Sequence, residues 1–162
     1  MPIWFRELTG QQRKLFVLAL WSLPVTHVAL RIFGFNRFYT FVNRFGRHKN
    51  DGSSSLAAKE SAINSTLQSL NYATHHGLFR GNCLSQSIVL WWLLRHQGVM
   101  SDLRIGVQFR HGSFRAHAWL EHNNSPINEH ETIQKDYATF QQTITPQTLG
   151  KLSLNSFNEE IR

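Results

Sequence analysis

The chain has 162 residues, of which 41% are hydrophobic and 12% aromatic, so it can bury one core but not two full domains. This composition excludes a largely disordered chain. The formal charge of +7 is uneven, because residues 1–50 hold eight Lys and Arg against a single acid. We expect no nucleic-acid partner, since no recognised binding motif accompanies this charge.

Residues 1–47 are predicted to form a basic, aromatic helical arm, in which aromatic residues alternate with arginines after residue 30. The pattern favours a pair of helices whose aromatic faces pack on the rest of the chain. The alternative is an arm that docks on a partner protein or a membrane surface, because aromatics and arginines suit both. Asn-Asp-Gly and three serines in residues 48–55 predict a linker before a domain over residues 56–162.

Residues 15–30 contain no charged side chain, but they are shorter than a comfortable membrane span and Pro24 interrupts them. The N-terminus does not have the pattern of a cleavable secretory signal. Cys83 is the only cysteine, so an internal disulfide is excluded and a reducing compartment is expected. We therefore expect a cytoplasmic protein, either in solution or associated with a membrane surface.

Two helices are predicted next. Ser55 can cap an amphipathic helix over residues 56–74. Asn82 can cap a second helix, which begins at Cys83, has apolar residues on almost every side and stops near Gly98. A helix without a polar face must be buried.

Strands follow these helices. The alternating residues 103–109 and 114–121 flank a His-Gly-Ser turn and predict an antiparallel hairpin. A second turn precedes a short predicted strand near residues 127–129. The hairpin and this strand would place several polar side chains beside the start of the buried helix.

Cys83 is predicted to lie in the first turn of the buried helix, where free amides and the helix dipole stabilise a thiolate. A lone buried cysteine is more often an inert small residue, and a nucleophile also needs a base and a group that orients it. His117, on the second hairpin strand, and Glu129, on the next strand, are the candidates for these roles. The other histidines lack the spacing of a metal site, and we expect no metal or cofactor.

Three further residues are candidates for substrate binding because of their positions. Asn82 and Gln86 lie close to Cys83 in the sequence, and Trp119 lies close to His117. The sequence assigns no side-chain donor to the oxyanion, so the amides at the helix start are the expected donors.

The order of these motifs resembles the transglutaminase-like cysteine peptidases of lasso-peptide biosynthesis, the B proteins. The resemblance covers about residues 56–140. It rests on Cys-Leu at a helix start, Leu-Leu-Arg-x-x-Gly at its end, Ile-Gly-Val on a strand, Ala-His-Ala-Trp on the next and an acid after Pro-x-Asn. The basic, leucine-rich N-terminal segment is similar to the start of the family's split form, in which a separate small protein carries the leader-recognition domain.

The resemblance implies an α+β fold of the papain and transglutaminase type, in which a central helix carrying the cysteine packs on an antiparallel sheet. It also implies proteolytic removal of the leader from a ribosomal lasso-peptide precursor. Cys83 would be the nucleophile, His117 the general base and acid, and Glu129 the orienting carboxylate. The implied partners are the precursor peptide, a separate leader-recognition protein and an ATP-dependent macrolactam cyclase. The arm and the catalytic domain fill the chain, so we expect the recognition protein to select the substrate.

Two positions depart from the family pattern. The family more commonly has Asp at the position of Glu129, which must reach one methylene further, and often has Arg at the position of Gln86. Two alternative functions keep the same fold. One is a transglutaminase-like amidase or acyl transferase with the same triad, and the other is a catalytically silent peptide-binding module.

Overall fold

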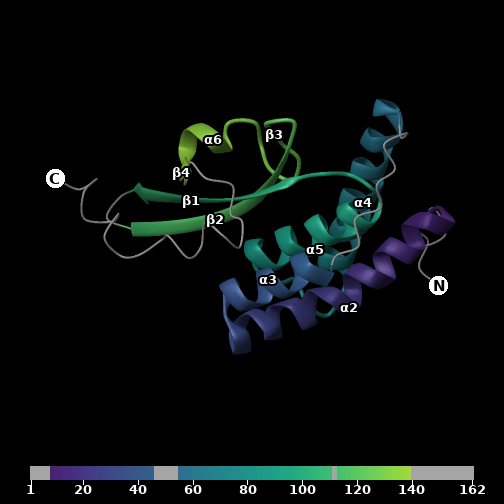
Figure 1. Cartoon of the computed structure of the whole chain (residues 1–162), viewed down its shortest axis with the longest axis horizontal. Helices are drawn as coiled ribbons and strands as arrows, with labels where there is room; N and C mark the ends of the chain where they lie inside the picture. Colours follow the sequence, from purple (N-terminus) through teal and green to yellow (C-terminus); the bar gives the residue numbers. More distant parts are fainter. Residues whose placement is uncertain (1–7, 46–54, 111–112, 140–162) are drawn as a thin grey trace.

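A layer of helices and one antiparallel sheet meet along a central helix in the computed structural model, which describes residues 8–45, 55–110 and 113–139 (Figure 1). The helices are α2 (Gly10–Phe33), α3 (Phe35–Phe45), α4 (Leu56–His76), α5 (Cys83–His96) and α6 (Ile133–Asp136). The strands are β1 (Asp102–Arg110), β2 (Ser113–His122), β3 (Ser125–Pro126) and β4 (Ala138–Thr139), in the order β3-β2-β1-β4. The predicted α+β fold class is confirmed.

The central helix is α5, which packs against α2 and α4 on one side and against β2 and β1 on the other (Figure 1). Its burial was predicted because it lacks a polar face to turn toward water, and the structure confirms this prediction. Its fully or almost fully buried residues include Ile88, Val89, Leu90, Leu93 and Leu94. The helix therefore carries its first residue, Cys83, to the boundary between the helical layer and the sheet.

Local sequence sets both ends of α5. The N–H of Ser85 donates to Asn82 Oδ1 at 2.9 Å, and the N–H of Asn82 donates to Ser85 Oγ at 3.0 Å. This reciprocal capping box fixes the start of the helix at Cys83. At the other end Gly98 has a φ of 77°, a left-handed conformation that glycine adopts without steric cost. The predicted cap and stop are both confirmed.

The hairpin of β1 and β2 is one residue longer at each end than the sequence predicts. Its register places Gly106 opposite His117. A Cβ atom on Gly106 would lie 2.8 Å from the ring of Trp119 and 2.8 Å from Cβ of Tyr137. Glycine at this position therefore lets two aromatic residues approach the strand beside His117.

The prediction of a strand over residues 127–129 is wrong by two residues, because β3 is Ser125–Pro126. The N–H of Ile127 still donates to the Leu120 carbonyl at 2.9 Å. The N–H of Leu120 then donates to the side-chain Oδ1 of Asn128 at 2.7 Å. A side chain thus takes the place of the backbone acceptor, and the ladder ends there. The sequence also did not predict α6 or β4, which pairs with β1.

The N-terminal helices share the core of the rest of the chain. Leu15, Ala19 and Leu23 of α2 are buried in the same cluster as the residues of α5. On α3, Asn43 accepts a hydrogen bond from Arg95 at 2.7 Å. Of the predicted linker only Ser55 lies within the described residues, where it caps α4 as predicted. The division of the chain at this linker stays a prediction.

Among the described helices, α2 alone is long and apolar enough to cross a membrane, a test that a core helix of a soluble protein also passes. The buried face of α2 is that of a core helix, whereas its exposed apolar side chains are typical of a segment that associates with a membrane. The predicted cytoplasmic compartment stays an expectation.

Candidate active site

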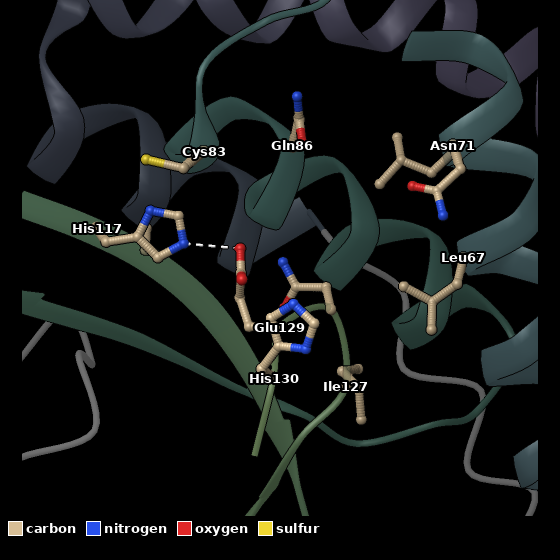
Figure 2. Close-up of a pocket in the computed structure, with 11 residues that line it drawn as sticks. Leu67, Asn71, Cys83, Gln86, His117, Ile127, Glu129 and His130 are labelled. Atoms are coloured by element: carbon tan, nitrogen blue, oxygen red, sulfur yellow. Dashed lines mark hydrogen bonds and ion pairs between the residues drawn. The ribbon is translucent and has the colours of Figure 1, made fainter. Parts of the chain in front are cut away.

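A cleft of about 520 Å³ opens between the start of α5, the strand β2 and the loop that follows β3 (Figure 2). Four of the six predicted site residues meet in it, namely Cys83 and Gln86 of α5, His117 of β2 and Glu129 of the loop after β3. The lining residues are Leu67, Leu70, Asn71, Cys83, Gln86, His117, Ala118, Ile127, Asn128, Glu129 and His130.

Cys83 is a free, half-buried thiol at the first position of α5. Helix geometry leaves the N–H groups of Cys83 and Leu84 without an acceptor inside the helix. These two amides and the positive end of the helix dipole lie at the end of α5 that carries Cys83, where they can stabilise negative charge. Figure 2 shows the sulfur directed toward the ring of His117.

His117 and Glu129 form a hydrogen-bonded pair, with Nε2 of the ring 2.7 Å from Oε1 of the carboxylate. An ionised carboxylate only accepts hydrogen bonds, so Nε2 carries the hydrogen and Nδ1 of the neutral ring is left as the base. In Figure 2 the ring lies between Glu129 and Cys83, with its other nitrogen on the side of the sulfur. At this distance the carboxylate of Glu129 reaches the ring directly.

A network of buried and half-buried hydrogen bonds holds the elements of the cleft together. The hydroxyl of Ser87 on α5 donates to the Ala118 carbonyl on β2 at 3.0 Å. The same hydroxyl accepts a hydrogen bond from Asn128 Nδ2 at 3.3 Å. Because Asn128 also binds the backbone of Leu120, it ties the loop that carries Glu129 to both neighbouring elements. The Pro-x-Asn motif in the sequence was the only signal for Asn128, and no signal pointed to Ser87.

Trp119 does not line the cleft. It is fully buried, and its Nε1 donates to Glu121 Oε1 at 3.0 Å. Trp119 was predicted as a candidate for substrate binding. It lies on the same face of β2 as His117, but its ring packs on Gly106 of the neighbouring strand and does not reach the cleft. Tyr137, which the sequence did not single out, lies closer to His117, with ring centroids 5.6 Å apart against 6.3 Å for Trp119.

The other two candidate substrate residues differ in position. Asn82 is not among the residues that line the cleft, and its side chain is used to cap α5. Gln86 does line the cleft, and its Nε2 donates to the Arg80 carbonyl at 2.8 Å. Gln86 therefore stays a candidate for contacts with substrate, whereas Asn82 acts on the helix that presents Cys83.

A buried carboxylate supports the sheet beneath Trp119. Glu121 binds Arg104 Nε at 2.8 Å and Gln134 Nε2 at 2.8 Å. Burial by itself would raise the pKa of Glu121, but the hydrogen bonds from Trp119, Gln134 and Arg104 and the charge of Arg104 together lower it. Glu121 is thus a charged structural group, and it does not line the cleft.

Within the described ranges, no three His, Cys, Asp or Glu side chains form a group that could hold a metal ion. The side chains that do meet are a thiol, an imidazole and a carboxylate. In this order they are the groups that activate a cysteine for attack on a carbonyl carbon.

The comparisons with known proteins agree with this fold. Residues 29–145, more than half of the chain, match the family profile of the Transglutaminase-like superfamily. No curated protein and no solved structure matches the chain significantly. The matched region contains Cys83, His117 and Glu129, and the superfamily includes cysteine peptidases and acyltransferases. The chain therefore belongs to the transglutaminase-like superfamily.

Proposed function

We propose that this protein is a cysteine peptidase that removes the leader from a ribosomally made lasso-peptide precursor. The observation that carries the proposal is the meeting of Cys83 with the pair of His117 and Glu129 in one cleft. The resemblance of the Cys-Leu, Ala-His-Ala-Trp and Pro-x-Asn motifs to the B proteins supports this substrate class. Membership of the transglutaminase-like superfamily supports cysteine-based acyl transfer.

The first half of the reaction forms a thioester. Cys83 gives its proton to Nδ1 of His117, and the thiolate attacks the carbonyl carbon of the scissile peptide bond. The amides of Cys83 and Leu84 stabilise the oxyanion that forms. The C–N bond then breaks as His117 returns the proton to the leaving amine, which is the new N-terminus of the core peptide. Glu129 stabilises the charged ring during both proton transfers.

The second half releases the leader. Water gives a proton to Nδ1 of His117 and attacks the thioester carbon. The C–S bond breaks, the leader leaves with a carboxyl terminus, and the proton returns to the sulfur of Cys83. The apolar side chains of Leu67 and Leu70 face the same cleft from α4, so they are available to hold an apolar side chain of the bound peptide.

Cleavage of a purified precursor by the full chain tests the proposal. Mass spectrometry should detect free leader and core with the wild type but not with Cys83→Ala. Ser61→Ala, at an exposed position on α4, is the matched control and should cleave normally. If the Cys83→Ala variant kept its full function in the pathway, the protein would instead be a catalytically silent peptide-binding module. Transfer of the leader to an added amine, in place of water, would indicate an acyl transferase.

The proposal extends to three partners. The precursor is the substrate, a separate leader-recognition protein delivers it, and an ATP-dependent macrolactam cyclase consumes the released core. The similarity of the basic, leucine-rich N-terminal segment to the start of the split form supports recognition of the leader by another chain. At micromolar precursor, the recognition protein should accelerate cleavage by raising the local concentration of peptide. Equal rates with and without it would mean that this chain reads the leader itself.

A further inference from the structure

The outer face of α2 carries a row of large apolar side chains that remain exposed. Helical periodicity places them on one side of α2, opposite the buried residues Leu15, Ala19 and Leu23. We call this row the α2 stripe, and it consists of Val17, Leu18, Trp21, Val25, Val28 and Ile32. Trp21 is 71% exposed and Ile32 is 67% exposed. A helix that is apolar on both faces is normally covered on both.

The charged side chains of α2 and α3 are all positive. Lys14 lies one helical turn before Leu18, and Arg31 adjoins Ile32, so an exposed cation marks each end of the row. Two more exposed arginines, Arg37 and Arg44, lie on α3. Neither helix contains an Asp or a Glu. An occupant of the stripe must therefore accept the cations at its two ends, and neither helix supplies an acid to offset them.

These charges decide against a second copy of the same chain. In a symmetric dimer through α2, the cations of one protomer would face those of the other, and like charges across an interface are unfavourable. A paired helix from another protein fits less well than lipid, because selective helix pairing uses charged residues beside the apolar row. Between the two charged ends of the stripe, the flanking positions on α2 are Ser22, Pro24 and Ala29, which offer no charge to a paired helix.

A small apolar cavity adjoins the stripe. It has a volume of about 150 Å³ and lies where α2, α3 and α5 meet. Its lining includes Val25, Phe38, Val42, Ile88 and Trp92. The lining also includes Ser22 and Thr26, and the Ser22 hydroxyl donates to the Ala19 carbonyl. Because most of the lining is apolar, a flexible hydrocarbon chain can enter the cavity without needing a hydrogen-bond partner.

We propose that the α2 stripe binds the surface of a membrane that contains anionic lipid. The inner face of α2 is part of the core, so the helix lies along the membrane plane, with Trp21 and its neighbours among the acyl chains. The cations at the two ends bind lipid phosphates, which supplies the second of the two attractions that stable surface binding needs. This inference does not depend on the chemistry of the cleft.

Flotation of the full chain with vesicles tests the inference. Vesicles of phosphatidylcholine with about a third phosphatidylglycerol should bind the wild type, and pure phosphatidylcholine should bind it more weakly because the charge attraction is lost. Trp21→Glu and the double variant Lys14→Glu, Arg31→Glu should each lower binding to anionic vesicles about tenfold or more, since each removes one of the two attractions.

Two controls make the result specific. Leu56→Glu changes a side chain that is 74% exposed on α4, away from the stripe, and should bind as the wild type does. Cys83→Ala should also bind normally, which separates membrane binding from catalysis. Circular dichroism must show that each variant is folded. Failure of the wild type to float, or equal flotation of Trp21→Glu and Leu56→Glu, would overturn the inference. So would a wild-type dimer in sedimentation that Trp21→Glu converts to a monomer.

Discussion

Asn128 donates a hydrogen bond from its side-chain Nδ2 to the hydroxyl of Ser87, at 3.3 Å. Ser87 lies one turn after Cys83 on α5, and Asn128 immediately precedes Glu129. The contact therefore connects the helix that carries the nucleophile with the loop that carries the acid. It positions both groups without touching either reacting atom.

We expect Asn128→Ala to slow precursor cleavage by up to about 100-fold, because small displacements of catalytic groups are costly even when the altered residue lies outside the chemistry. Asn128→Asp keeps an acceptor for the Leu120 amide but loses the donor to Ser87, so its rate should lie between those of the wild type and Asn128→Ala. Mass spectrometry measures the cleavage rates, and thermal unfolding shows whether each variant is folded. Asn64→Ala, exposed on α4, is the control. Normal turnover by a folded Asn128→Ala would contradict the positioning role.

Cys83 should react with iodoacetamide faster in the folded protein than in the denatured chain at the same pH, because His117 lies beside the sulfur and can take its proton as a general base. His117→Ala should slow the folded protein's reaction about tenfold or more. Alkylation is followed by mass spectrometry, and His75→Ala, at an exposed position on α4, should leave it unchanged. A folded protein whose thiol reacts no faster than the denatured chain would remove the basis for Cys83 as nucleophile.

Glu129→Gln should lower the cleavage rate by about 100-fold or more, since a neutral amide no longer stabilises the charged ring of His117. Glu129→Asp should also be slower than the wild type, because the loop is placed for a side chain that reaches 2.7 Å from Nε2. Steady-state kinetics on precursor distinguishes the three proteins. Glu131→Gln, two residues along and exposed, is the matched control. An unchanged rate in Glu129→Gln would rule out its orienting role.

The lowered pKa of Glu121 makes a pH-dependent contribution to stability. Since the folded-state pKa lies below the unfolded value, the contribution is complete above the unfolded value and is lost as the pH falls through the folded one. Glu121→Gln should lower the free energy of unfolding by about 1–3 kcal/mol at pH 7, because it weakens hydrogen bonds to a buried charge. The difference from the wild type should shrink below about pH 4. Urea denaturation at several pH values measures it, and a constant difference would contradict the assignment.

The two faces of α2 should respond differently to truncation. Leu23→Ala empties a fully buried site and should lower the free energy of unfolding by about 2–5 kcal/mol. Val25→Ala, two residues later at a side chain that is 61% exposed, should cost less than about 1 kcal/mol. Urea denaturation compares the two. Equal effects would mean that α2 does not pack on the core as the structure shows.

Much of the site could be predicted because its signals are local. The amide of Asn82 and the hydroxyl of Ser85 lie three positions apart, so the helix start and the placement of Cys83 follow from neighbouring residues. Strand alternation likewise placed His117 on the second strand of the hairpin. Because α5 has no polar face, its sequence predicts that it is buried, although it does not predict which elements pack against it.

The tertiary structure alone decided the relationships between residues that are distant in the sequence. Periodicity does not tell which carboxylate reaches His117, since that depends on how Asn128 ends the ladder beside Leu120. It also gave no reason to prefer Tyr137 over Trp119 as a neighbour of His117. Nor could it tell which face of the apolar α2 would be buried. A local pattern fixes the secondary structure and the polarity of a segment, whereas the partner of each face follows from packing against residues far along the chain.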